Sequence, residues 1–147
     1  MIELVVVLII VGILLSVVYV AHNGVITANN NKQREANIQT IQGALEGYYA
    51  QDSVYPTQAD LNSPTWVSKH LNDFSAGTLQ DPSWSASAIC TSNGHSIVIS
   101  KATPNCYSYQ VISTDGSSCN DTNVPCAHYT LTAILSGGVK YVKSSLN

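Results

Sequence analysis

The chain has 147 residues, which is enough for one ordinary domain. Its net charge is −3, and its six Lys and Arg residues are too few for the dense basic face of a nucleic-acid-binding protein. Only 10% of the residues are charged, and Ser, Thr and Asn are abundant, a composition that suits an extracellular surface better than a cytosolic one.

The first predicted element is an apolar helix over residues 4–21. These 18 residues carry no charge, and as a helix they are ~27 Å long, close to the hydrocarbon thickness of a bilayer. A helix that is apolar on every side must be covered by lipid or by the core of an assembly. A secretory signal peptide is disfavoured because it starts with basic residues, whereas the first basic residue here is Lys32. A simple membrane anchor and an assembly helix whose Glu3 meets a positive charge on a neighbour both stay open.

We expect the same helix to continue to about residue 50, since the first proline is Pro56. Residues 27–35 are polar all round, which indicates a solvated or inter-subunit stretch. Beyond them the apolar residues recur at helical spacing and predict an amphipathic half that packs on a head. This stripe consists of Ile38, Ile41, Leu45 and Tyr48. The whole helix would be ~73 Å long, a stalk with the head at its far end.

Residues 51–147 are expected to form one small head. Three prolines within residues 51–82 indicate a connecting region, with one short helix near residues 61–71. The pattern then changes to period two and predicts strands at residues 96–101, 106–112, 129–135 and 139–143. We expect one hairpin between the first two strands and another between the last two, with its turn at Gly137 and Gly138. Three or four antiparallel strands would pack against the stripe of the helix, which makes the fold α+β.

The cysteines indicate an oxidising compartment. All four lie late in the chain among turn residues, and an even number there is typical of two disulfides. A zinc site is disfavoured because no two cysteines are as close as C-x-x-C. Three pairings are possible, and we favour the two that close short local loops, Cys90–Cys106 and Cys119–Cys126.

Two stretches resemble type IV pilins and the related pseudopilins. One is residues 2–7 (IELVVV) followed by residues 10–14 (IVGIL), and the other is Arg34 followed by residues 38–49 (IQTIQGALEGYY) and 55–56 (YP). The resemblance covers the first third of the chain, and the head only in architecture. It implies a leader removed by a prepilin peptidase, a methylated new N-terminus and residence in the membrane. Assembly into a helical homopolymer by a membrane platform and its ATPase would follow.

In the implied filament the N-terminal helices bundle in the core, and Glu3 pairs with the terminal amine of an adjacent subunit. We expect Glu3 to set the register, since a misplaced subunit leaves both charges unpaired. The core positions are Leu4, Val7, Ile10, Val11, Gly12, Leu14 and Leu15.

The sequence departs from the family pattern in two ways. The family glutamate usually lies about two residues further from the mature N-terminus, and Gly12 is displaced by the same amount, so we expect two mature residues to precede Met1. Many pilins also carry a proline about eight residues after that glycine, where this chain has Val20.

We predict no metal site and no cofactor. The histidines are scattered without ligand spacing. A weak Ca²⁺ candidate in the loop 115–125 consists of Asp115, Asp121 and Asn123, which offer few carboxylates. Residues 120–122 (NDT) match the N-glycosylation pattern. Three strand tyrosines are expected to pack in the sheet rather than to form a binding platform: Tyr107, Tyr109 and Tyr129.

The sequence gives no support for an enzyme, because it has no G-x-S-x-G motif, no Gly-rich phosphate loop and no paired carboxylates in an apolar setting. We predict a major pilin that serves adhesion, twitching-type motility or DNA uptake. Its three parts are a filament-core or transmembrane helix (1–24), an amphipathic helix half (25–50) and a disulfide-stapled head (51–147). The alternatives are a pseudopilin of a secretion or competence system and a monomeric membrane-anchored binding module. An adhesive function would reside in the loops 61–82 and 115–125.

Overall fold

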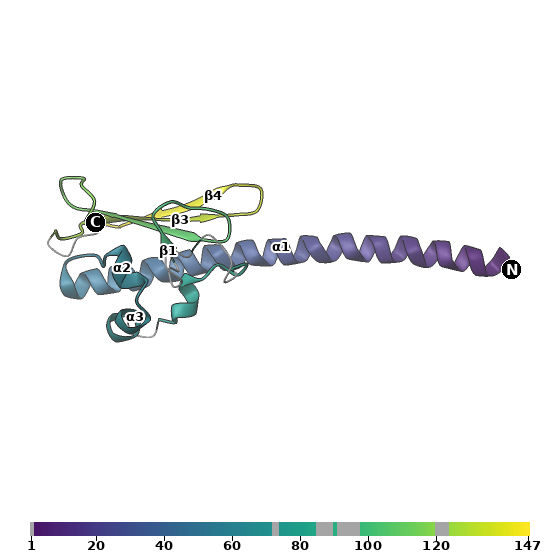
Figure 1. The fold of residues 1–147 in the computed structure, drawn as a ribbon, viewed down its shortest axis with the longest axis horizontal. Coiled ribbons are helices and arrows are strands. Elements are labelled where there is room, and N and C mark those ends of the chain that lie inside the picture. Colours follow the sequence, from purple (N-terminus) through teal and green to yellow (C-terminus); the bar gives the residue numbers. More distant parts are fainter. Residues whose placement is uncertain (1, 72–73, 85–89, 91–97, 120–123) are drawn as a thin grey trace.

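The structure, a computed structural model, describes residues 2–71, 74–84, 90, 98–119 and 124–147 (Figure 1). A long N-terminal helix is followed by three short helical elements and four strands, so the chain is α+β as predicted. In Figure 1 the sheet lies along one side of the second half of the N-terminal helix (α1, Ile2–Asp52), and the short helix Pro64–His70 (α3) lies on the other side.

Helix α1, Ile2–Asp52, is uninterrupted over 51 residues, in agreement with the helix expected over residues 2–50. It ends at Ser53, whose φ of 58° is left-handed and whose N–H donates to the carbonyl of Tyr49 at 2.8 Å. Only its second half lies against the head (Figure 1). Within the described part of the chain, no helix has both the length and the apolar character needed to cross a membrane.

The connecting region holds α2, Gln58–Leu61, and α3, Pro64–His70, where one helix was predicted, followed by the 3-10 turn η1, Ala76–Leu79. The break has a local cause, because Pro64 cannot continue a preceding helix and instead occupies the first turn of α3. Each short helix has its own cap. The Thr57 hydroxyl accepts from the Asp60 N–H in a capping box, and the Ser63 hydroxyl accepts from the Trp66 N–H.

The sheet contains β1, Val98–Ile99; β2, Tyr107–Ile112; β3, His128–Ile134; and β4, Lys140–Ser144, in that spatial order. The prediction of an antiparallel sheet is wrong for the first pair: β1 and β2 are parallel, and the other two pairs are antiparallel. The reason is the position of the turn. A tight turn lies immediately before β2: Asn105 has a φ of 67°, and the Cys106 N–H donates to the carbonyl of Thr103. The chain leaves the end of β1, runs back alongside it and reverses at this turn, so that β2 runs in the same direction as β1.

The last two strands form the hairpin that the two consecutive glycines predicted. Gly137 and Gly138 have φ values of 85° and 81°, which only glycine adopts without strain. The Leu135 N–H donates to the carbonyl of Val139 at 2.7 Å and closes the hairpin.

The core lies between the second half of α1 and the inner face of the sheet. Ile38, Ile41 and Leu45 are completely buried, at no more than 1% exposure, and Tyr48 is partly buried beside them. The residues that meet them from β2 and β3 alternate along each strand, as expected for a sheet with one covered face. They are Tyr107, Tyr109, Val111, Tyr129, Leu131 and Ala133.

Candidate assembly surface

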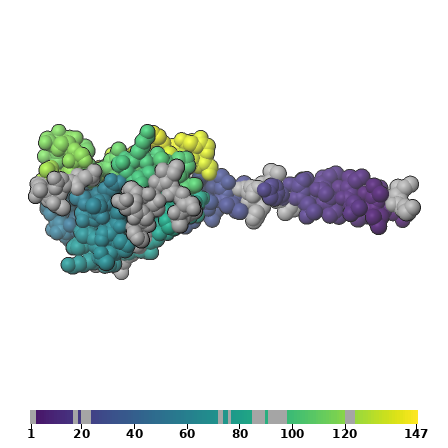
Figure 2. All heavy atoms as spheres, in the orientation of Figure 1, coloured from purple at the N-terminus to yellow at the C-terminus, as the bar shows by residue number. Residues whose placement is uncertain are grey.

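The first half of α1 carries a dense set of exposed apolar side chains. Leu4 and Leu15 leave 66% and 65% of their surface uncovered, and Tyr19 and Val25 leave 69% each. Figure 2 shows this length of helix projecting beyond the head. A contiguous apolar surface of this kind marks an interaction site, because water disfavours it strongly.

The residues predicted to lie in a filament core all occur on this length of α1. They do not select one face, since the consecutive residues Val5, Val6 and Val7 are all about half exposed. Glu3 lies exposed in the first turn, where the positive end of the helix dipole favours a carboxylate. The geometry therefore agrees with a helix that can be surrounded on every side.

A buried ion pair fixes the second half of α1 to the head. The Arg34 Nε donates to Asp81 Oδ2 at 2.7 Å, and its Nη2 donates to Asp81 Oδ1 at 2.9 Å. Both residues are almost fully buried, at 4% and 5% exposure. The hydrogen bonds to Asp81 raise the pKa of Arg34 above its ordinary value, against the opposing effect of burial. This two-point clamp sets the rotation of the helix relative to the head.

Further polar contacts extend the clamp along the base of the head. The Asn31 Oδ1 accepts from Arg34 Nη1 at 3.0 Å and from the Ser136 N–H at 3.0 Å, next to the β3–β4 turn. The Asn30 amide donates to the Ser83 hydroxyl at 3.2 Å. One face of the stretch 27–35, expected to be solvated or inter-subunit, therefore bonds to the chain's own head.

A second polar cluster lies near the far end of the head. The Glu46 carboxylate accepts from the hydroxyls of Tyr55, at 2.9 Å, and Tyr129, at 2.8 Å, and from the Leu146 N–H at 3.2 Å. Burial raises the pKa of Tyr55 to about 12, and burial together with Glu46 also raises that of Tyr129. Tyr109, whose ring lies next to that of Tyr129, does not contact Glu46 in this way but donates its hydroxyl hydrogen to the carbonyl of Pro56 at 2.7 Å.

Both predicted disulfides are confirmed. Cys90–Cys106 has a Cα–Cα distance of 5.7 Å and holds the start of β2. Cys119–Cys126 has a Cα–Cα distance of 5.5 Å and closes the loop before β3. The Tyr55 N–H donates to the carbonyl of Cys126 at 2.9 Å, so this loop is joined to the segment after α1.

The structure describes only part of the weak Ca²⁺ candidate. The Asp115 carboxylate accepts from the Ser113 hydroxyl and from the Ser117 N–H, and these hydrogen bonds lower its pKa to about 2. Asp121, Asn123 and the glycosylation pattern at residues 120–122 lie outside the described residues. Among those described, no three His, Cys, Asp or Glu side chains cluster as metal ligands.

The sequence analysis did not identify the clamp or the Glu46 cluster. Arg34 and Asp81 are 47 residues apart, and Glu46 and Tyr129 are 83 apart. The available signal in the sequence was weak: the clamp and the cluster contain three charged residues, Arg34, Asp81 and Glu46, in a chain that has few of them. Comparison with protein-family models, with curated proteins and with solved structures gives no match for this chain.

Proposed function

We propose that this chain is a structural subunit of an extracellular helical filament of the type IV pilin kind, and that it polymerises through the first half of α1. One observation carries the proposal: apolar side chains on every side of that helix stand exposed beyond the head. The occupant that best covers such a surface is a second copy of the same helix, which is equally apolar. Where neighbouring copies pack by different faces of this helix, the contacts are head-to-tail, and they extend into an open filament unless they close into a ring.

The magnitudes favour association. Burying one Val, Leu or Ile side chain contributes about 1.5–3 kcal/mol. Association costs an estimated 4–15 kcal/mol in lost translational and rotational freedom. The exposed set on α1 includes Leu8, Ile9, Ile10 and Ile13 among more than ten large apolar residues. Partial burial of several of them offsets the cost of association.

Glu3 would give this apolar contact its register. A helix bundle excludes water, so an unpaired carboxylate inside it is strongly disfavoured. A positive group of a neighbouring subunit, such as its terminal amine, would satisfy Glu3 in one register and leave it unpaired in others. Specificity would thus come from the charge and affinity from the apolar surface.

The head would form the outer layer, held at a fixed angle by the Arg34–Asp81 clamp. Such filaments would serve adhesion, motility or DNA uptake, with prepilin processing, a membrane platform and an ATPase supplied by other proteins. Residence in the membrane before assembly is proposed from the uncharged run at residues 4–21 alone. A pseudopilin and an anchored binding module are the other proposals.

The test is electron microscopy of material sheared from the native cells, with mass spectrometry of the same fraction. We expect thin uniform filaments dominated by this chain. Glu3→Leu should abolish or strongly reduce them, whereas the control Glu35→Leu, which removes a helix charge close to the head, should keep them. Absence of filaments, with the chain left in the membrane fraction, would favour the anchored module. Normal filaments from Glu3→Leu cells would reject the register role alone.

A further inference from the structure

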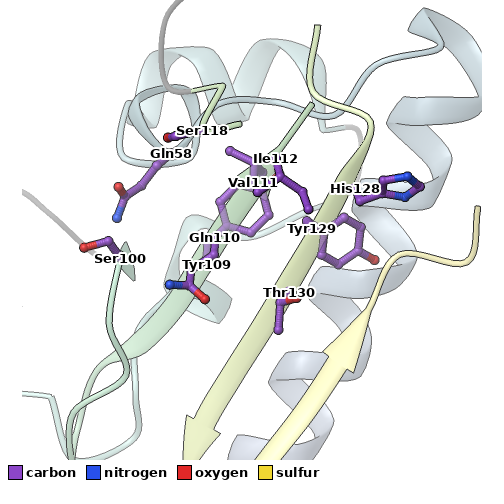
Figure 3. Close-up of a pocket in the computed structure, with 10 residues that line it drawn as sticks. All are labelled: Gln58, Ser100, Tyr109, Gln110, Val111, Ile112, Ser118, His128, Tyr129 and Thr130. Atoms are coloured by element: carbon purple, nitrogen blue, oxygen red, sulfur yellow. The ribbon is translucent and has the colours of Figure 1, made fainter. Parts of the chain in front are cut away.

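A hollow of about 350 Å³ opens beside the sheet where β1 ends and β2 continues (Figure 3). In Figure 3 Gln58, Ser100 and Ser118 lie on one side of it. Gln110 and Thr130, which face each other across β2 and β3, contribute from the strands. Volumes of about 300–1,000 Å³ are typical of small-molecule sites.

The side chains around the hollow have unused hydrogen-bonding capacity. Within the described part of the chain, the side chains of Ser100, Gln110, Ser118 and Thr130 make no hydrogen bond. Gln58 donates one amide hydrogen to the carbonyl of Val98 at 3.2 Å, which orients its amide and leaves its oxygen available. Three hydroxyls and two amides, each able to donate and accept, therefore surround one space.

The chemistry of this lining selects the class of ligand. Of the ten described residues that line the hollow, none is Asp, Glu, Lys or Arg. The one imidazole of the lining, His128, is already hydrogen-bonded through Nδ1 to the carbonyl oxygen of Asn147 at 2.9 Å. The lining therefore offers a phosphate or carboxylate no lysine or arginine partner, and it offers a cation no carboxylate. Hydroxyls and amides match the alternating donors and acceptors of a sugar, and Ile112, 40% exposed at the rim, offers an apolar contact for its C–H groups.

We propose that this hollow binds a neutral saccharide, either free or as part of a glycan. The binding site would then lie mainly on the sheet. The loop 115–125, which was expected to carry an adhesive function, would contribute one residue to it, Ser118. The binding is independent of filament assembly, because every residue invoked belongs to one head. Its failure and the failure of the proposed function are therefore separable.

The test is a titration of the ¹⁵N-labelled full chain, kept monomeric in a detergent without a sugar head group. The probes are maltose, lactose and diacetylchitobiose at up to about 50 mM, which detects dissociation constants in the mM range. We expect at least one to give saturable shifts of the Gln110 and Thr130 backbone amides. Dextran and a neutral β-glucan form a second arm: binding of a polysaccharide but of no disaccharide would assign the site to glycans.

Two variants make the outcome specific. Gln110→Ala should weaken binding about five- to tenfold, the size expected for one lost neutral hydrogen bond or slightly more. The matched control Gln51→Ala removes an exposed glutamine of α1 that bonds to the carbonyl of Gly47, and it should leave binding unchanged. The proposal is overturned if no saccharide shifts these amides, if Gln110→Ala binds as wild type does, or if the shifts depend on protein concentration alone, which would indicate contact with a second copy.

Discussion

Glu46 on α1 accepts the hydroxyl hydrogen of Tyr129 on β3 at 2.8 Å, although 83 residues separate them in the chain. The same carboxylate binds Tyr55 and the N–H of Leu146. One acidic side chain therefore joins the helix to β3, to the segment that follows the helix and to the segment that follows β4. A charged acceptor makes such hydrogen bonds stronger than neutral ones.

Removing this carboxylate should destabilise the head. Glu46→Ala leaves two buried phenol hydroxyls without their acceptor, and we expect a loss of about 2–4 kcal/mol in the free energy of unfolding. Urea denaturation followed by far-UV circular dichroism measures the loss. Glu35→Ala is the control and should change stability by less than about 0.5 kcal/mol. Equal effects of the two variants would contradict a special role for Glu46.

The same cluster should make the head sensitive to alkali. The pKa of Tyr55 is raised to about 12 in the folded state, and an unfolded tyrosine ionises near pH 10. Between pH 10 and 12 the unfolded state therefore binds fewer protons than the folded state. The stability that protonated Tyr55 contributes is fully present below pH 10 and is lost as pH rises towards 12. Thermal melts from pH 9 to 12 should show this fall. Tyr55→Phe should make this fall less steep, and Tyr19→Phe, on the exposed part of α1, should leave it unchanged; the other buried tyrosines, such as Tyr129, keep part of the fall in both variants.

The Arg34–Asp81 clamp predicts an asymmetric response to mutation. Arg34→Ala leaves the Asp81 carboxylate buried without its cation and should cost about 3–5 kcal/mol. Replacing both residues, as Arg34→Met with Asp81→Leu, should recover much of that loss, because no charge is then left buried. Urea denaturation of the single and double variants, with Lys32→Ala as the control, measures the difference. A double variant as unstable as the single one would show that the loss does not come from the stranded carboxylate.

Two kinds of glycine should respond in opposite directions to alanine. A Cβ at Gly43, within α1, meets nothing within 4 Å, so Gly43→Ala should stabilise the chain by about 1 kcal/mol. Gly137 has a φ of 85° in the β3–β4 turn, so Gly137→Ala should destabilise it by about 1–2 kcal/mol. Thermal denaturation of both variants in the same buffer tests the pair. A destabilised Gly43→Ala monomer would indicate that this face of α1 is not open.

The hollow beside β2 shows how far local patterns reach. Ser100, Gln110 and Thr130 were visible in the sequence as ordinary polar residues of strands and turns. They become neighbours through the tertiary fold: among the described residues, β1 pairs in parallel with Tyr107 and Ser108 of β2, and Gln110 further along that strand lines the hollow. The predicted hairpin would have paired these two strands over more of the length of β2. That arrangement does not predict a hollow beside Gln110.

Features that depend on neighbouring residues in the chain could be predicted from the sequence. Helical spacing and the lack of proline before Pro56 defined α1 almost to its last residue. Period-two patterns placed the strands, two glycines placed the β3–β4 turn, and short separations selected the two disulfide pairings. Each of these depends on backbone geometry or loop closure over a few residues, which a local pattern records.

Contacts between residues far apart in the chain became visible in the three-dimensional fold. The direction of β1, the Arg34–Asp81 clamp and the Glu46–Tyr129 contact join residues far apart in the chain. A buried charged group must be paired, but the sequence allows many possible pairs of charged residues. Only the packing of the folded chain selects one of them. Helices, strands and turns could be predicted because they depend on interactions between residues close in the chain. Contacts between distant residues could not, because which side chains are buried together depends on how the whole chain packs.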